Sequence, residues 1–210
     1  MVEPGNEHLS KTEWRSRITA ERRSQVSEEH AREAAALAAA AARLPGEVVC
    51  AYVPFGTEPG STSLLDQLLD QGKRVLLPIV PDVPGPLEWA AYEDSSSLGP
   101  GRLRGLLEPT GRRLGPDTLG TADLVLIPAL AVDDAGVRLG RGAGYYDRSL
   151  SFAAPGAALI AVVRDTELVR ELPAEPHDVR MTGVLTPEQG LAPRPVDRLT
   201  PRRSGSERAQ

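Results

Sequence analysis

Short apolar runs recur along the chain and alternate with segments that have a helical pattern. Runs rich in Val, Leu and Ile and bounded by polar, Gly or Pro residues are typical of strands buried on both faces of a sheet. Such runs span 47–53 (EVVCAYV), 73–80 (KRVLLPIV), 122–130 (ADLVLIPAL) and 157–163 (AALIAVV). Residues 87–93 (LEWAAYE) predict an edge strand, and residues 179–186 (VRMTGVLT) predict the final strand.

Helical patterns fill the intervals between these strands. Ser10 and Glu13 form a capping box, which predicts a helix that continues to residue 25. Its basic residues at spacings of four and seven fall close to one face: Lys11, Arg15 and Arg22. A second helix, with Ser27 as its N-cap, carries an alanine run and stops near 44–46. Further helices are expected over 63–72, 145–153 and 165–172.

The order strand, helix, strand predicts βαβ units with right-handed crossovers. We therefore expect an α/β fold of three layers, α/β/α, with a mostly parallel sheet and the N-terminal helices packed on one side. With 210 residues, the chain is long enough for one core, and we expect a single domain over 10–192. A disordered lead is expected over 1–9 and a flexible tail over 193–210. Residues 98–116 predict a long loop, whose arginines suggest that it closes over a ligand.

Composition excludes several classes of protein. The net charge of −5 argues against nucleic-acid binding, which needs a strongly basic face. No apolar run is long enough to span a membrane, and the N-terminus lacks an apolar signal core. We therefore expect a soluble, cytoplasmic protein, and a monomer. Cys50 is the only cysteine and lies in an apolar run, which favours a buried strand residue over a nucleophile.

Candidate chemistry is concentrated in residues 136–150 (GVRLGRGAGYYDRSL), between a predicted strand and a predicted helix. Glycines allow a ligand to lie against bare backbone, and arginines neutralise phosphate oxygens. Asp147, one turn into the helix, is well placed to hold a magnesium ion that bridges those phosphates. These residue types together fit a nucleoside triphosphate with its metal.

Two other interpretations of this segment remain open. The segment matches neither the Walker pattern nor the dinucleotide fingerprint, so a glycine-rich turn with tyrosines packed into the core is equally compatible with it. A single RGRG is also found in RNA-binding elements, but one copy in an acidic chain does not favour that function.

Residues 126–150 (LIPALAVDDAGVRLGRGAGYYDRSL) resemble the signature of the 5-formyltetrahydrofolate cyclo-ligase family. In that family a strand ending in Pro-Gly-hydrophobic-Ala-Phe-Asp leads into Arg-Leu-Gly-x-Gly-x-Gly-Tyr-Tyr-Asp. The resemblance extends in order over most of the chain, at 11–15 (KTEWR), 72–78 (GKRVLLP), 106–109 (LLEP) and 172–181 (LPAEPHDVRM). It implies a fold like that of sugar-phosphate isomerases and coenzyme A transferases.

The resemblance also implies roles for individual residues. ATP would be bound by Lys11, Arg15, Arg138, Gly140, Arg141, Gly142, Ala143, Gly144, Tyr145 and Tyr146. The folate would be bound by Val53, Glu58, Arg141, Gly142, Gly144 and Tyr145, with Glu58 hydrogen-bonded to the pterin. Arg141 and Tyr145, between the two ligands, would be catalytic. Magnesium would be held by Asp147 and Asp178.

The implied reaction is the ATP-dependent conversion of 5-formyltetrahydrofolate to 5,10-methenyltetrahydrofolate, with release of ADP and phosphate. The formyl oxygen would attack the γ-phosphate, and ring nitrogen 10 would then close the methenyl bridge. Phosphoryl transfer needs positioning and charge neutralisation, which glycines, arginines, lysine and magnesium supply.

The chain departs from the family pattern at a few positions, and two other functions stay open. Ala129 and Val132 stand where glycine and phenylalanine are usual, and Thr182 stands where aspartate is common. Thr182 leaves open a non-catalytic member that only binds nucleotide or folate. Loop glutamates, Glu58 or Glu108, would instead serve an isomerase or acyl-transfer enzyme acting on a phosphorylated sugar or thioester.

Overall fold

A computed structural model describes residues 9–176 and 178–194. Its centre is a seven-stranded sheet in the order β12-β11-β9-β6-β1-β2-β3, in which the strands from β11 to β2 run parallel and both edge strands are antiparallel. The bounds of these strands are β1 (Val48–Cys50), β2 (Arg74–Ile79), β3 (Glu88–Ala91), β6 (Leu124–Pro128), β9 (Ala158–Val162), β11 (Gly183–Thr186) and β12 (Gly190–Pro193). The mostly parallel α/β sheet expected from the sequence is confirmed.

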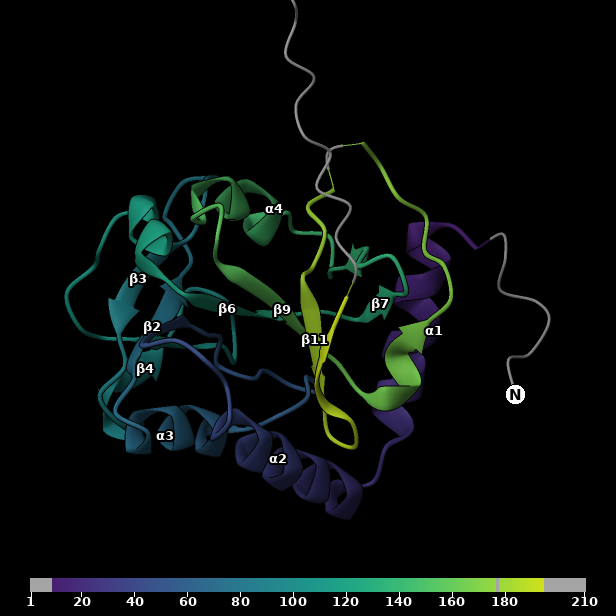
Figure 1. The fold of residues 1–210 in the computed structure, drawn as a ribbon, viewed down its shortest axis with the longest axis horizontal. Helices are drawn as coiled ribbons and strands as arrows, with labels where there is room; N and C mark the ends of the chain where they lie inside the picture. Colours follow the sequence, from purple (N-terminus) through teal and green to yellow (C-terminus); the bar gives the residue numbers. More distant parts are fainter. Residues whose placement is uncertain (1–8, 177, 195–210) are drawn as a thin grey trace, which may run out of the picture.

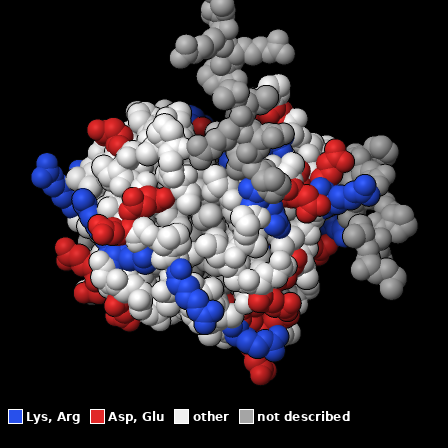
Figure 2. Space-filling model, in the orientation of Figure 1, with Lys and Arg blue, Asp and Glu red and all other residues white. Residues whose placement is uncertain are grey.

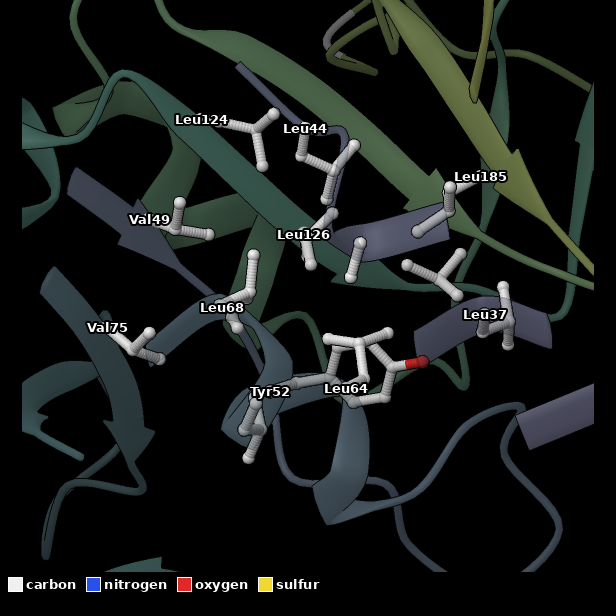
Figure 3. Packing of buried hydrophobic residues seen from close by; sticks show 14 of the residues in the cluster. Leu37, Leu44, Val49, Tyr52, Leu64, Leu68, Val75, Leu124, Leu126 and Leu185 are labelled. Carbon is white, nitrogen blue, oxygen red and sulfur yellow. The ribbon is translucent and has the colours of Figure 1, made fainter. Parts of the chain in front are cut away.

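Successive residues of the buried strands point to opposite faces of the sheet, so each apolar run supplies two cores. Val49, Leu124 and Leu126 pack with α2 (Ser27–Ala41) and α3 (Thr62–Asp70) on one face. Figure 1 shows these two helices lying along that face, and Figure 3 shows the leucines between them and the strands. Cys50 and Val125 face the other core, which is covered by short elements: η2 (Pro116–Thr121), α4 (Tyr145–Ser149) and η3 (Leu150–Phe152). The three layers of the prediction are thereby confirmed.

Helix α1 (Lys11–Ser24) does not join α2 on the face of the sheet, so the expectation that the N-terminal helices pack on one side is wrong for it. Its apolar residues Trp14 and Ile18 pack on Leu130 and Leu139, next to a small sheet. That sheet has the order β10-β7-β8, with bounds β7 (Ala131–Asp133), β8 (Arg138–Leu139) and β10 (Leu168–Val169). The predicted capping box of Ser10 and Glu13 is confirmed. Ser27 is the first residue of α2 and not its cap, which is Val26.

Three segments differ from the prediction in type. Residues 165–172 form the 3-10 turn η4 (Asp165–Glu167) and β10, because Leu168 pairs with Val132 in the small sheet. The 98–116 segment, predicted as a loop, contains a hairpin of β4 (Leu98–Pro100) and β5 (Leu107–Pro109), and the 3-10 turn η1 (Ser95–Ser97) precedes it. Strand β12 was not predicted. It includes Pro193, the first residue of the predicted tail. Residues 1–8 of the predicted lead and 195–210 of the predicted tail lie outside the described residues.

The order of strands changes direction between β1 and β6. From β1 the chain crosses to β2 on one side, whereas β6, β9 and β11 follow on the other. The connections that leave the carboxyl ends of β1 and β6 therefore diverge and leave a crevice, where open α/β sheets bind ligands. Both segments that carry the predicted site, 53–58 and 128–147, begin at this edge.

The surface carries charges of both signs. Figure 2 shows Lys and Arg side chains interspersed with Asp and Glu on one face, with no continuous basic area in this view. Among the described helices, none combines the length and apolar character that a membrane span requires.

Gly136 and Gly72 offer a matched test of the turn that opens the glycine-rich segment. Both have positive φ, +77° and +74°, but an alanine Cβ would lie 2.6 Å from the Met181 carbonyl oxygen at Gly136, whereas no atom lies within 4 Å at Gly72. We expect Gly136→Ala to lower the free energy of unfolding by about 3 kcal/mol and Gly72→Ala by only about 1 kcal/mol. Denaturant unfolding measures both; equal losses would contradict the close approach of the two backbones.

Candidate functional site

A pocket of about 220 Å³ opens at the carboxyl edge of the sheet, between β1 and β6. One wall is the glycine-rich segment, a second is the loop after β1, and a third is apolar. Its lining residues are Tyr52, Val53, Phe55, Glu58, Pro78, Val80, Leu87, Leu103, Leu106, Leu107, Pro128, Ala129, Arg138, Gly140, Arg141, Gly142, Ala143, Gly144, Tyr145, Tyr146 and Asp147. Segments far apart in sequence thus meet in one cavity.

The glycine-rich wall is shaped by backbone that only glycine adopts readily. Gly142 and Gly144 have φ of +100° and +70°. Arg15, from α1, donates from Nε to the carbonyl oxygen of Gly140 over 2.9 Å, and its guanidinium lies against Gly142. Arg15, which the family resemblance assigns to ATP, therefore lies beside this loop and contacts its backbone. Helix α4, which follows this wall, has only five residues.

Arg138 joins three elements at the floor of the pocket. Its Nη1 donates to the carbonyl oxygen of Pro128 over 3.3 Å, and its Nη2 pairs with Asp147 Oδ1 at 2.5 Å. The guanidinium lies 5.8 Å from the centre of the Tyr146 ring. Asp147 remains exposed on its other side, with 58% of its side chain accessible, so it can also bind a ligand.

Tyr145 and Tyr146 both line the pocket and pack against the apolar core beneath it. The hydroxyl of Tyr146 is buried and has no hydrogen-bond partner among the described residues. Burial, with the nearby Glu58 carboxylate, raises the pKa of Tyr146, so the hydroxyl stays a neutral donor. The two interpretations of the segment, core tyrosines and a binding loop, are therefore compatible.

Glu58 is a buried carboxylate at the end of the loop after β1. Its Oε1 accepts a hydrogen bond from Arg141 Nε over 2.9 Å, and its Oε2 accepts one from the Phe55 backbone amide over 3.1 Å. Burial raises the pKa of Glu58, and Arg141 opposes that shift. Arg141 also lies 5.8 Å from the centre of the Phe55 ring. One arginine thus connects the glycine-rich wall to the acidic group across the pocket.

The apolar wall was not predicted as part of the site. Leu103, Leu106 and Leu107 come from the β4–β5 hairpin and line the pocket together with Val80 and Leu87. The leucines stand among Gly, Pro and Arg in the sequence, so no periodic signal marked them. The arginines of 98–116 suggested that this segment closes over a ligand, but it is the leucines of the segment that line the pocket.

Lys11 and Asp178 lie together but outside the pocket lining. Lys11 Nζ is 3.0 Å from Asp178 Oδ2 and 3.4 Å from Glu175 Oε1. Asp178 also accepts a hydrogen bond from the backbone amide of Glu175. The structure therefore brings Asp147, but not Asp178, to the pocket, and within the described parts of the chain no three His, Cys, Asp or Glu side chains form a preassembled metal site.

Three residues with alternative sequence interpretations have structural roles and are not among the residues that line the pocket. Thr182 Oγ1 accepts from the Leu159 amide and donates to its carbonyl oxygen, at the amino ends of β9 and β11. Buried Glu108 accepts from the Val80 amide and anchors the hairpin to the end of β2. Burial raises the pKa of Cys50 to about 12, which confirms the prediction of an inert strand residue.

Comparison with known proteins gives consistent matches. Residues 7–187 match the model of the 5-formyltetrahydrofolate cyclo-ligase family. A 5-formyltetrahydrofolate cyclo-ligase of Mycolicibacterium smegmatis is 50% identical over 188 residues, 87% of this chain and 96% of that protein. The Escherichia coli K12 protein of that name is 33% identical over 143 residues, 67% and 78% of the two chains. The solution structure of Aquifex aeolicus 5,10-methenyltetrahydrofolate synthetase has a TM-score of 0.75 at 25% identity and covers 94% of this chain and 100% of that one.

Glu58→Gln tests the burial of this carboxylate. Because burial raises the pKa of Glu58 above its usual 4.5, its contribution to stability is present below about pH 4.5 and is lost as pH rises through the folded-state pKa. Glutamine does not ionise, so the melting temperature of the variant relative to wild type should rise as the pH increases above about 4.5. Exposed Glu188→Gln is the control. A constant or falling difference for Glu58→Gln would show that the carboxylate is not held in a desolvated position.

Proposed function

The chain belongs to the 5-formyltetrahydrofolate cyclo-ligase family, and on that premise we propose that it converts 5-formyltetrahydrofolate to 5,10-methenyltetrahydrofolate in a Mg²⁺-dependent reaction that consumes ATP and releases ADP and phosphate. The observation that carries the proposal is the Arg141–Glu58 pair, which joins a phosphate-type wall to a buried acidic wall in one pocket. A reaction that transfers the terminal phosphoryl group of one ligand to the other needs both ligands at this contact.

The glycine-rich wall is proposed to bind the ATP phosphates. Its glycines leave the backbone accessible, while Arg138, Arg141 and Arg15 supply positive charge from three directions. Lys11, from the same helix as Arg15, is proposed to approach the phosphates as well, which requires exchange of its present carboxylate partners for phosphate oxygens. Loop residues Ala143 to Tyr146 complete this wall.

The opposite wall is proposed to bind the folate. A pterin presents a row of N–H donors, which a carboxylate such as Glu58 accepts, and its flat ring fits an apolar slot. Val53 and the hairpin leucines supply such a slot beside Glu58. Formation of that hydrogen bond leaves Arg141 between the pterin and the phosphates, where we place the reacting groups. Tyr145, which lines the same cavity, would flank them.

The proposed reaction has two steps. The formyl oxygen attacks the γ-phosphorus, and the bond from phosphorus to ADP breaks, which gives a phosphorylated imidate. Nitrogen 10 then attacks the imidate carbon, the carbon–oxygen bond breaks, phosphate leaves, and nitrogen 10 loses its proton. Arg138 and Arg141 neutralise charge on the transferred group, while the apolar wall excludes the water that would hydrolyse the intermediate.

Asp147 is the carboxylate that fits a magnesium ion at this pocket. Mg²⁺ is usually held by one or two carboxylates together with waters and substrate phosphates, so a single exposed oxygen donor beside the phosphate wall suffices. When bound, the ion would neutralise charge on the triphosphate. A role for Asp178 as a second ligand stays a prediction, since its present contacts include Lys11.

The other candidate functions rest on Thr182, Glu108 and Glu58, of which only Glu58 lines the pocket. The non-catalytic alternative relied on Thr182, whose hydroxyl bonds the Leu159 backbone at the edge of the sheet away from the pocket. The isomerase alternative offered Glu108, which anchors Val80 and does not line the pocket. Glu58 does line it, paired with an arginine suited to a phosphate neighbour.

A spectroscopic assay tests the proposal. Purified protein with 5-formyltetrahydrofolate, ATP and Mg²⁺ should produce the near-ultraviolet absorbance of the methenyl product, and omission of ATP should abolish it. Asp147→Asn should lower kcat about 100-fold and raise the Mg²⁺ concentration needed for half-maximal rate, because a neutral amide binds the ion weakly. Asp134→Asn, an exposed carboxylate in the preceding turn, should leave both values unchanged. Product without ATP would overturn the proposal, and an unchanged Mg²⁺ requirement in Asp147→Asn would overturn the metal assignment.

A further inference from the structure

Arg22 is a buried arginine behind the pocket, at the last turn of α1. Its Nε and Nη2 bind both carboxylate oxygens of Glu167, at 2.6 and 2.7 Å. Nη2 also donates to the carbonyl oxygen of Ala129 over 2.7 Å. Only 2% of the Arg22 side chain and 4% of the Glu167 side chain are accessible. The guanidinium therefore ties the end of α1 to the segment that leaves β6.

Arg164 makes the equivalent connection from the end of β9. Its Nη1 donates to the carbonyl oxygen of Thr57 over 3.2 Å, and its Nε pairs with Glu33 of α2 at 2.7 Å. Its backbone amide and Nη1 both reach Glu167, so this carboxylate is shared by the two arginines. Arg22, Glu167 and Arg164 form one buried network, which we call the rear network.

The rear network ends on two backbone carbonyls that belong to the walls of the pocket. Ala129 lines the pocket, and Thr57 immediately precedes Glu58. None of the three network side chains lines the pocket. Any effect they have on a bound ligand must therefore pass through the position of these two segments.

Fold stability alone does not account for such a network. A buried ion pair seldom stabilises a protein more than well-packed apolar residues of the same volume, because both charges lose their hydration. Moreover, Arg22 Nη1 is buried with no hydrogen-bond partner within residues 9–176 and 178–194, which is a further cost. The ion pairs instead fix the orientation of the groups that they bind, because a planar guanidinium holds its hydrogen-bond acceptors at defined angles.

We propose that Arg22, Glu167 and Arg164 are positioning residues for the folate side of the pocket, which hold the Thr57–Glu58 segment and the Ala129 segment in register with each other. The proposal deepens the proposed function and rests on it, since it assigns Glu58 to the folate. Arg22 also lies close enough to Glu58 to lower the pKa of that carboxyl against the effect of burial, which agrees with the short path between them. The phosphate wall has a further tether, from Arg15 to Gly140, that involves none of the three network residues.

Steady-state kinetics of Arg164→Met and Arg22→Met separate positioning from general stability. Loss of either tether should raise KM for 5-formyltetrahydrofolate at least about tenfold while KM for ATP stays within about twofold. Arg164→Lys, which keeps one donor and the charge, should restore part of the folate affinity. Arg17→Met, exposed on the same helix and paired with Glu21, is the matched control and should change neither constant.

A purely structural role predicts a different result. Partial unfolding would reduce the active fraction, so kcat would fall while both KM values stayed unchanged, and that outcome overturns the proposal. If a single variant does not fold, the double variant Arg22→Met with Glu167→Met removes both charges together, which folds tolerate better than one unpaired charge. It should again raise KM for the folate alone.

Calorimetric binding of 5-formyltetrahydrofolate separates failure of this proposal from failure of the proposed function. An active wild type whose variants bind the folate with wild-type affinity contradicts the positioning role only. A wild type that neither forms product nor binds the folate contradicts the proposed function, and the positioning role with it. If the wild type binds the folate without turnover, the variants should still bind it at least about tenfold more weakly. Equal affinities would contradict the positioning role.

Discussion

Parallel strands β2, β1, β6 and β9 end at one edge of the central sheet, and the chain leaves β1 and β6 in opposite directions. The positions of both pocket walls depend on this divergence. It brings a buried glutamate from residue 58 to within hydrogen-bond distance of an arginine at residue 141, and it places a glycine-rich turn where no side chains fill the crevice. The cores on both faces hold that edge rigid, since each strand contributes side chains to both.

Arginines serve two separate purposes around this edge. Arg138 and Arg141 face the pocket and have carboxylate partners that a phosphate can replace or share. Arg22 and Arg164 lie behind it and hold backbone carbonyls. A ligand that carries several negative charges is expected to rearrange the first pair and leave the second in place. The division explains how a site can exchange charged partners during a reaction without loss of its shape.

Local patterns were enough to predict the parallel strands of the sheet and the capping box of α1, and they drew attention to the glycine-rich segment that lines the pocket. Strands with apolar residues on both faces, and glycines where φ is positive, are properties of short segments. Glu58 entered the prediction only through the family resemblance, because a loop glutamate has no local signal. The leucines of the hairpin were missed because their environment comes from a distant segment: Leu103 lines the same pocket as Val80. Strand β12 was missed although it pairs with the neighbouring β11, because its four residues, GLAP, carry no strand pattern. The spacing of Lys11, Arg15 and Arg22 predicted a common face of α1, but not that their partners would be Asp178, Gly140 and Glu167.

The central claim is that the pocket directs the γ-phosphoryl group of ATP onto the formyl oxygen of the folate. The most direct measurement uses 5-formyltetrahydrofolate labelled with ¹⁸O in the formyl group and follows the label by mass spectrometry of the released phosphate. If the oxygen is phosphorylated and then expelled by nitrogen 10, each phosphate formed with the methenyl product carries one ¹⁸O. Phosphate that contains only unlabelled oxygen would mean that ATP is hydrolysed by water, and would contradict the account.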